Sequence, residues 1–563
     1  MEKKKPSPKM VLIVLFLIVI IGAVGLMANH FLPSSETVDS KEYFGIEDSS
    51  QIALVVNQEL LEDKAILIDN QIYISQTTVN QYISSRFYMD SEAGAMVYTL
   101  PEEVITLPTG EKEFTAGGET IKEDTAMVVK EKDGYYISLD FIKQYTDMKC
   151  ESYENPGRVV ISTQTSSLTM GEATSEYTVR KKGGIKSPIL TKGTSGDQLI
   201  YLETLENWTK VATEDGYIGY VKNSEIPEGI DGQIEFNCQG PEYTNISKDY
   251  KISMGWHLIT SANDDSLAEK IAGCTGMNTI SPTWYTLADN EGNLQSRANK
   301  AYVKQAHKAG LEVWAMIENI NVDVDTEKIL SSAKARARII KTLMKEAKKY
   351  GFDGINVDLE NIAEDAAPHY LQFIRELSVS CRKAGLVLSV DNPVPARYNS
   401  YYDRKEQAAV VDYVINMGYD EHYSGSDEAG SVASLPYVKE SIENSLLEVP
   451  KEKLINALPF YTRLWTEPFG SSNIESKALG MDAADAYVKE HNMESYWDET
   501  LGQNVAKTED SKAQYEIWLE DEQSIEEKMK LVKENDLAGA AFWQLGYQRD
   551  TVWEIINKYL NLN

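Results

Sequence analysis

The sequence predicts an α/β chain whose C-terminal half folds as a (β/α)8 TIM barrel. In front of it we expect a small all-β barrel, a duplicated α+β module and one N-terminal transmembrane helix. One observation predicts the large barrel, and the length of the chain predicts further domains. From Lys251 onward, short β-rich segments alternate with amphipathic helical segments, and eight such alternations fill the length that one barrel uses. At 563 residues the chain is too long for one core, so several domains are expected.

The eight candidate barrel strands are 252–256, 277–281, 312–317, 354–359, 386–390, 413–419, 454–460 and 539–543. Helical stretches such as 326–350 and 370–384 fall between them. The whole chain divides into a cytoplasmic tail (1–9), a transmembrane anchor (10–32), a linker (33–50), the duplicated module (51–165), the small all-β domain (175–228) and the large barrel (245–563).

The N-terminus is the basic part of the chain. Four lysines (Lys3, Lys4, Lys5 and Lys9) precede residues 10–27, an unbroken run of apolar residues and glycine. Such a run is long enough to cross a bilayer, and the basic flank should stay in the cytoplasm. Everything after Leu32 would then be extracytoplasmic. A cleaved signal peptide is the alternative, but residues 26–29 are a poor cleavage site, which favours an uncleaved anchor.

Composition excludes several classes of protein. The chain has 55 Lys+Arg against 87 Asp+Glu, a net charge of −32, and so lacks the basic face that binding to nucleic acid needs. Its cysteines are scattered without metal spacing and imply no disulfide framework; they are Cys150, Cys238, Cys274 and Cys381. Dispersed histidines without an HExxH pair argue against a zinc enzyme, and neither a GxSxG elbow nor a P-loop occurs. We expect no metal and no cofactor.

An approximate repeat marks the duplicated module. The pattern Y-I-S, followed by an apolar residue and Q-Y, occurs at 73–82 and again at 136–145. Each copy predicts a short strand, a short helix and a closing strand, at 95–100 and 158–162, and two such units would bury their apolar faces on each other. The region resembles the N-terminal module of copper amine oxidases. It shows neither metal spacing nor paired catalytic groups, so we assign it a spacer or binding role.

The small all-β domain shows strand-like segments at 178–180, 199–202, 208–211 and 217–221. Asp215-Gly216 between the last two is a strong hairpin signal. The order W-x-K-V, D-G, G-Y-V resembles a bacterial SH3-like domain, and this resemblance implies attachment to peptidoglycan. A rigid spacer is the alternative, because a fold alone does not fix function.

The fourth barrel strand carries the chemistry. Residues 353–360 read D-G-I-N-V-D-L-E, and side chains alternate along a strand, so Asn356, Asp358 and Glu360 share one face. In a barrel this face points inward, with its carboxylates at the C-terminal end of the strand, where barrel enzymes act. Two carboxylates so close cannot both ionise freely, which keeps a protonated acid available. An acidic strand of an unrelated sheet, or a calcium site, is the alternative.

These residues resemble the D-G-x-D-x-D-x-E signature of glycoside hydrolase family 18, the chitinase-like barrels. Three further motifs match in order: 417–420 (M-G-Y-D), 458–463 (L-P-F-Y-T-R) and 541–543 (A-F-W). Residues 281–285 and the Asn of the signature look most like the spore-cortex and wall-lytic branch of the family.

The resemblance implies a role for each site residue. Glu360 would protonate the leaving oxygen, Asp358 would orient the substrate's 2-acetamido group, whose carbonyl oxygen is the nucleophile, and Tyr419 would hydrogen-bond that group. Trp543 would form the floor under the sugar. The remaining predicted substrate-binding residues are Met417, Asp420, Tyr461, Arg463, Asp353 and Asn356. Core packing or salt bridging is an equally good interpretation for several of these, and the better one for Trp256, Trp284 and Trp314.

Two departures from the family pattern stand out. Asn356 replaces the middle Asp of the signature, which removes one inward carboxylate and should alter the pKa of Asp358. The third strand, 313–318, lacks the S-x-G-G pattern of typical chitinases, which weakens a claim for crystalline chitin.

The leading hypothesis is a membrane-anchored glycosidase with an extracytoplasmic active site. It would cleave β-1,4 links of an N-acetylglucosamine-containing glycan, peptidoglycan or chitin-like, with retention. The rival is a catalytically weak, lectin-like wall protein that binds glycan in the barrel cleft. Partners are the glycan and the membrane, and the oligomeric state is open.

Overall fold

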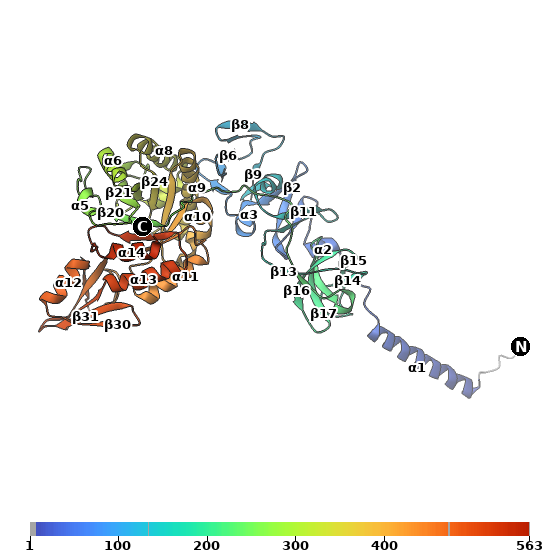
Figure 1. Cartoon of the computed structure of the whole chain (residues 1–563). Coiled ribbons are helices and arrows are strands. Elements are labelled where there is room, and N and C mark those ends of the chain that lie inside the picture. Colours follow the sequence, from blue (N-terminus) through green and yellow to red (C-terminus); the bar gives the residue numbers. More distant parts are fainter. Residues whose placement is uncertain (1–6, 133, 471–472, 562–563) are drawn as a thin grey trace. The chain divides into compact units, whose positions relative to one another are not determined.

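The computed structural model describes residues 7–132, 134–470 and 473–561 (Figure 1). Chain contacts divide it into two compact units. The first comprises residues up to 87, 109–112 and 123–241, and the second comprises 88–108, 113–122 and the chain from 242 onward. The predicted tail, 1–9, lies mostly outside the described residues. Helix α1 (Pro8–Phe31) covers the predicted anchor at 10–32. In the part of the chain that is described, no helix is long and apolar enough to cross a membrane.

The first unit opens with the short helix α2 (Ser40–Phe44) and a seven-stranded sheet in the order β11-β12-β1-β2-β3-β10-β9. Its strands are β1 (Gln51–Val56), β2 (Glu59–Ile68), β3 (Gln71–Ser75), β9 (Val128–Glu131), β10 (Gly134–Ser138), β11 (Lys149–Tyr153) and β12 (Arg158–Ser162). The repeat is visible here, because β3 leads into α3 (Gln76–Tyr82) and β10 leads into α4 (Leu139–Tyr145). The equivalent strands pair antiparallel about Ile74 and Ile137, as two copies related by a local twofold axis would.

The two copies differ in their closing strands. The second copy closes with β12 in the same sheet, as predicted, but the first closes with β5 (Ala95–Thr99), which lies in another sheet. That sheet, in the order β4-β5-β6-β7-β8, groups with the second unit. Its other strands are β4 (Tyr88–Asp90), β6 (Val104–Pro108), β7 (Glu113–Ala116) and β8 (Glu119–Lys122). The first closing strand therefore lies outside the sheet that holds the rest of the repeat, and it contacts helix α9 (Ala367–Ala384) of the second unit.

The second sheet of the first unit is the predicted small all-β domain, in the order β15-β14-β18-β17-β16-β13-β19. The four predicted segments correspond to β14 (Tyr177–Arg180), β16 (Gln198–Thr204), β17 (Trp208–Thr213) and β18 (Ile218–Lys222). The turn at Asp215-Gly216 joins β17 to β18, with Gly216 at φ +91°, a conformation that favours glycine. Sequence reasoning missed β13 (Leu168–Glu172), β15 (Ile189–Gly193) and β19 (Ile230–Gly232), while the single-turn helix η1 spans Asn223–Glu225.

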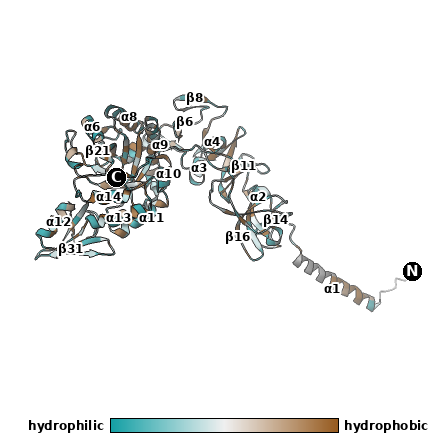
Figure 2. Cartoon of the chain, viewed as in Figure 1, coloured by the Kyte–Doolittle hydropathy of each residue, from teal (hydrophilic) through white to brown (hydrophobic). Residues whose placement is uncertain are grey.

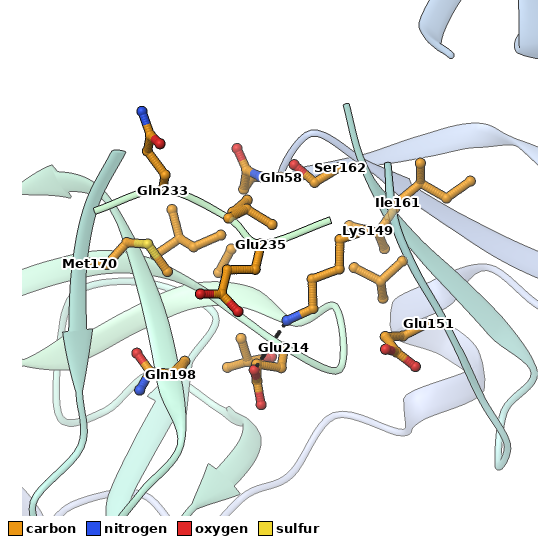
Figure 3. A pocket seen from close by; sticks show the side chains of 16 residues that line it. Gln58, Lys149, Glu151, Ile161, Ser162, Met170, Gln198, Glu214, Gln233 and Glu235 are labelled. Carbon is orange, nitrogen blue, oxygen red and sulfur yellow. Dashed lines mark hydrogen bonds and ion pairs between the residues drawn. The ribbon is translucent and has the colours of Figure 1, made fainter. Parts of the chain in front are cut away.

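A cavity of about 400 Å³ lies between these two sheets of the first unit (Figure 3). Its lining includes the aliphatic side chains of Val160 and Ile200 and an ion pair between Lys149 Nζ and Glu214 Oε1 at 3.4 Å. The sequence did not predict this cavity.

The predicted (β/α)8 barrel forms the core of the second unit. Its eight parallel strands run β20-β33-β27-β26-β25-β24-β23-β21, and β20 pairs with β21 to close the circle. The strands are β20 (Ile252–His257), β21 (Thr279–Leu287), β23 (Glu312–Glu318), β24 (Gly354–Asp358), β25 (Val387–Pro393), β26 (Tyr413–Met417), β27 (Leu454–Pro459) and β33 (Gly539–Trp543). Each corresponds to one predicted segment, so the barrel prediction is confirmed. A short strand, β22 (Leu294–Ser296), extends β21 antiparallel.

Helices surround the barrel, and in Figure 2 they carry much of the hydrophilic colour while the strands are mainly hydrophobic. They are α5 (Leu267–Lys270), α6 (Lys300–Lys308), α7 (Thr326–Ser331), α8 (Ala333–Tyr350), α9 (Ala367–Ala384), α10 (Arg404–Val410), α11 (Leu435–Leu446), α13 (Glu522–Glu534) and α14 (Val552–Leu560), with the short 3-10 helices η2 (Glu364–Ala366) and η3 (Arg397–Tyr402). Ile355 and Val357 pack in the cluster that these helices share, whereas Trp256 and Trp314 lie in a separate cluster inside the barrel. The alternation expected for the fourth strand is therefore present, and these tryptophans pack in the core.

An insertion after β27 adds a five-stranded sheet and one helix that the sequence did not predict. The sheet runs β29-β28-β32-β31-β30, with β28 (Tyr461–Pro468), β29 (Glu475–Gly480), β30 (Glu494–Asp498), β31 (Gln503–Glu509) and β32 (Ala513–Leu519), and the helix is α12 (Met481–Glu490). Two predicted site residues, Tyr461 and Arg463, begin this sheet on β28.

Candidate active site

A cleft of about 460 Å³ opens at the C-terminal ends of the barrel strands. Seven of the predicted site residues line it: Asp358, Glu360, Met417, Tyr419, Asp420, Tyr461 and Trp543. They come from four separate stretches of sequence, which only closure of the barrel brings together. The further lining residues are Trp256, Met316, Asn361, Asp391, Pro393, Val394, Tyr398, Tyr423 and Tyr437.

Asp358 ends strand β24 and is buried, with only 9% of its surface exposed. On the neighbouring strand Glu318 lies directly opposite it in the register. Burial, followed by the charges of Asp391, Glu360 and Glu318, raises the pKa of Asp358 well above its usual value. Within the described residues its Oδ1 has no hydrogen-bond partner. A carboxyl in these surroundings is suited to holding or sharing a proton.

Glu360 follows the strand and opens to the cleft. Its backbone is fixed by Asn319, whose Oδ1 accepts from the Glu360 amide at 2.8 Å and whose Nδ2 donates to the Glu360 carbonyl at 2.9 Å. Desolvation by the cleft walls, followed by the charges of Asp420 and Glu318, raises the pKa of Glu360. The side chain therefore has the properties of a general acid that keeps its proton above the usual carboxyl range.

Strand β26 delivers the second group of side chains. The chain turns after Met417, and Asp420 adopts φ +62°. The Tyr461 hydroxyl donates a hydrogen bond to Asp420 Oδ1. Burial raises the pKa of Asp420, and the Tyr461 hydrogen bond opposes that rise. Tyr419 packs edge-on against Tyr461 with ring centroids 6.4 Å apart, and burial raises its pKa well above the usual value, so it is a neutral hydrogen-bond donor.

Trp543 ends the last strand, β33, and forms one wall of the cleft. Its ring meets the buried Trp256 edge-on, with centroids 6.0 Å apart. Because Trp256 is fixed in the barrel core, it holds the Trp543 indole in place for contact with an apolar sugar face.

Three predicted binding residues do not line the cleft. Asn356 is fully buried one layer below it. Asp353 lies before the N-terminal end of β24, where its Oδ2 meets His307 Nε2 and the Val313 amide, each at 2.8 Å. Asp353 therefore does not line the cleft, because the length of the strand lies between the two.

Arg463 points into the inserted sheet instead. Its guanidinium donates to Ser476 Oγ at 3.2 Å, and it reaches the cleft only through its charge, which opposes the rise in the pKa of Asp420. It acts on the site indirectly, not as a lining residue.

Sequence reasoning missed Asp391, Glu318, Tyr398 and Tyr423. Asp391 and Glu318 are buried on the strands that flank β24, and each is a carboxylate near the C-terminal end of a predicted strand, a signal that could have found them. Tyr398 lies on the short helix η3 and Tyr423 on the loop after β26, with 81% and 52% of their surface exposed. Neither tyrosine belongs to a motif whose period or spacing would mark it in advance.

Comparison of the sequence with known protein families agrees with this geometry. Residues 285–548 match the family model described as glycosyl hydrolases family 18. The chain carries a family 18 domain. Residues 175–227 match the bacterial SH3 domain and residues 55–161 match the copper amine oxidase N-terminal domain, so both further resemblances are confirmed.

Relatives of the family 18 domain include the cortical fragment-lytic enzyme of Bacillus cereus, 26% identical over 280 residues, which are 48% of this chain and 65% of the relative. This chain therefore spans less than two-thirds of that relative's length. Among solved structures, the Bacillus cereus spore cortex-lytic enzyme SleL is 23% identical, with a TM-score of 0.50, over 59% of this chain and 78% of that one. The chitinase from Chromobacterium violaceum is 18% identical, with a TM-score of 0.50, over 55% of this chain and all of that one. At these identities the solved structures show the fold alone.

Proposed function

We propose that the family 18 domain hydrolyses β-1,4 links of an N-acetylglucosamine-containing glycan, with retention of configuration. One observation carries the proposal: Asp358, Glu360 and Tyr419 meet in one cleft with the indole of Trp543. Two carboxyls with raised pKa beside an aromatic wall supply what acid-catalysed cleavage of a glycosidic bond needs.

The bond is broken with the help of the substrate. Glu360 gives its proton to the leaving oxygen, while the carbonyl oxygen of the substrate's own 2-acetamido group attacks the anomeric carbon. Asp358 accepts a hydrogen bond from the acetamido N–H, and Tyr419 donates one to the same group. Water then opens the cyclic intermediate, and Glu360 takes up the proton that this water loses.

The surroundings of Asp358 support this route over a protein nucleophile. A carboxylate nucleophile has to be ionised, and burial together with three neighbouring carboxyls disfavours the ionised form of Asp358. Glu360 is the more open of the two carboxyls, and it has the access to the leaving oxygen that a proton donor needs.

Peptidoglycan is the favoured glycan, with a chitin-type polymer as the alternative. Two features support it: relatives named as cortical fragment-lytic enzymes, and a bacterial SH3 domain in the same chain. The SH3 domain would hold the enzyme on this polymer, or else serve as a spacer.

Digestion by the purified full-length chain tests the activity. The wild type should release new reducing ends from peptidoglycan or N-acetylglucosamine oligomers, and Glu360→Gln should lose at least about 100-fold in rate, the contribution of a general acid. If the wild type binds oligomers but releases no new reducing ends, the domain is a lectin and the catalytic proposal fails. A Glu360→Gln rate equal to that of the wild type would also contradict the proposal, because Glu360 would not be the acid.

The extracytoplasmic location is also a proposal. It rests on the basic residues that precede an apolar segment at the N-terminus. Added protease should digest the family 18 domain in intact cells from which the wall has been removed. Protection from the protease until the membrane is lysed would contradict the location.

A further inference from the structure

Asp358 has a second buried aspartate beside it. Val357 pairs with Val390 in the parallel register of β24 and β25, so the residues that follow, Asp358 and Asp391, lie at the same level on adjacent strands. Asp391 has only 2% of its surface exposed. Each carboxyl has one buried oxygen with no hydrogen-bond partner among the described residues: Oδ1 of Asp358 and Oδ2 of Asp391.

The other oxygen of Asp391 is held by Asn356. The Asn356 Nδ2 donates to Asp391 Oδ1 at 2.7 Å and to Ser389 Oγ at 3.1 Å. The family signature has its middle aspartate at position 356. In this chain β24 lacks that carboxyl, but β25 supplies one, Asp391, which is hydrogen-bonded to Asn356.

Glu318 flanks Asp358 on the opposite side, but it has partners of its own. Its Oε1 accepts from Thr286 Oγ1 at 2.8 Å and lies 4.0 Å from the Arg297 guanidinium. Among the residues that the structure describes, Asp391 forms no ion pair, and its Oδ1 accepts a hydrogen bond from a neutral amide. A buried carboxyl of this kind is stabilised by a proton, which a neighbouring carboxyl can share.

We propose that Asp358 and Asp391 share one proton across β24 and β25, and that Asp391 is a positioning residue for catalysis in place of the missing aspartate at 356. The inference rests on the proposed function. In the resting site the pair holds one proton and one negative charge. As positive charge develops on the acetamido nitrogen, the proton moves fully to Asp391 and the negative charge to Asp358. The proton stays within the pair, and it returns when the intermediate is hydrolysed.

Other titratable groups face this pair and set its background. Glu360 and Glu318 add negative charge, and the neutral phenols of Tyr370 and Tyr419 lie close enough to feel both aspartates. Burial, together with the charge of Glu360, raises the pKa of both aspartates well above the usual value, although the Asn356 hydrogen bond opposes the rise for Asp391. Such raised values are expected of a pair that retains a proton near neutral pH.

Carboxyl exchange in the full-length chain tests the proposal. Asp391→Asn should lower kcat on N-acetylglucosamine oligomers by about 100-fold. It should also move the acid limb of the pH–rate profile to lower pH, because the Asp391 charge raises the pKa of Asp358. The double variant Asn356→Asp/Asp391→Asn returns a carboxyl next to Asp358 and should recover much of the rate. Glu318→Gln removes a flanking charge that has its own partners, so it measures the purely electrostatic effect and should have the smaller consequence.

Stability gives a readout that needs no substrate. If the folded pair holds a proton, one of its carboxyls has a higher pKa in the folded than in the unfolded chain. The pair's contribution to the stability of the folded protein then falls as pH rises above the unfolded carboxyl range. The free energy of unfolding, measured with urea, should fall less between about pH 5 and 8 in Asp391→Asn than in the wild type. Identical pH dependence in the two proteins, or a double variant no more active than Asp391→Asn, would overturn the proposal. If Glu360→Gln loses activity but Asp391→Asn does not, the shared-proton proposal fails while the proposed function stands.

Discussion

The Trp256 indole N–H donates a hydrogen bond to Asn356 Oδ1 at 2.9 Å in the floor of the barrel. Ser281 Oγ donates to the same oxygen at 3.0 Å, while the amide nitrogen of Asn356 donates toward β25. An ionised aspartate at 356 could accept the first two bonds but could not donate to Asp391. The amide at this position therefore fits a network that has its carboxyl on the next strand.

Asn356→Asp alone should destabilise the chain, and more so at higher pH. The new carboxyl would be buried beside Asp358 and Asp391, so its folded pKa would lie above its unfolded one. Such a group costs stability as pH rises above the unfolded value of about 3.9. Urea unfolding at about pH 4.5 and pH 7.5 should give a larger loss at the higher pH. An equal loss at both would show that the substitution acts through packing alone.

Glu360 should set the basic limb of the pH–rate profile. An acid has to be protonated to donate, so activity should fall as pH rises through the raised pKa of Glu360. The charge of Asp420 contributes to that rise, and Asp420→Asn keeps an oxygen that can accept the Tyr461 hydroxyl. This variant should therefore move the basic limb to lower pH. An unmoved limb would mean that another group, and not Glu360, supplies the proton.

Arg336→Leu should destabilise the second unit. The guanidinium is fully buried, lies 3.1 Å from Glu376 and 3.5 Å from Asp90 of strand β4, and packs over the ring of Tyr88. Removing one partner of a buried ion pair leaves uncompensated charge and typically costs about 3–5 kcal/mol. Urea unfolding measures the loss. Lys439→Leu is the control, because its pair with Glu443 is exposed and its loss should be under about 1 kcal/mol.

The sequence was enough to predict the barrel because its signals are local. Alternation along 353–360 depends on strand geometry, and so does the inward position of Asp358 and Glu360. The pairing of Asp358 with Asp391 could not be predicted, because it depends on the register between β24 and β25, which neighbouring residues do not encode. The same holds for the closing strand β5. The internal repeat predicted that β5 would pair within its own copy, but in the structure it belongs to a separate sheet. There Gln372 of α9 donates a hydrogen bond to Thr99 at 3.2 Å.

Tyr398→Ala should weaken binding of substrate without changing the chemical step. Tyr398 lines the cleft with 81% of its surface exposed, so its aromatic face is open to an outer sugar. Loss of an aromatic contact of about 0.5–1.5 kcal/mol should raise KM for long oligomers by about 2- to 12-fold and leave kcat unchanged. Tyr496→Ala is the matched control, because this tyrosine is 53% exposed on β30 and does not line the cleft. A fall in kcat in the Tyr398 variant would assign that ring to the reacting sugar; an unchanged KM would show that the glycan does not extend across it.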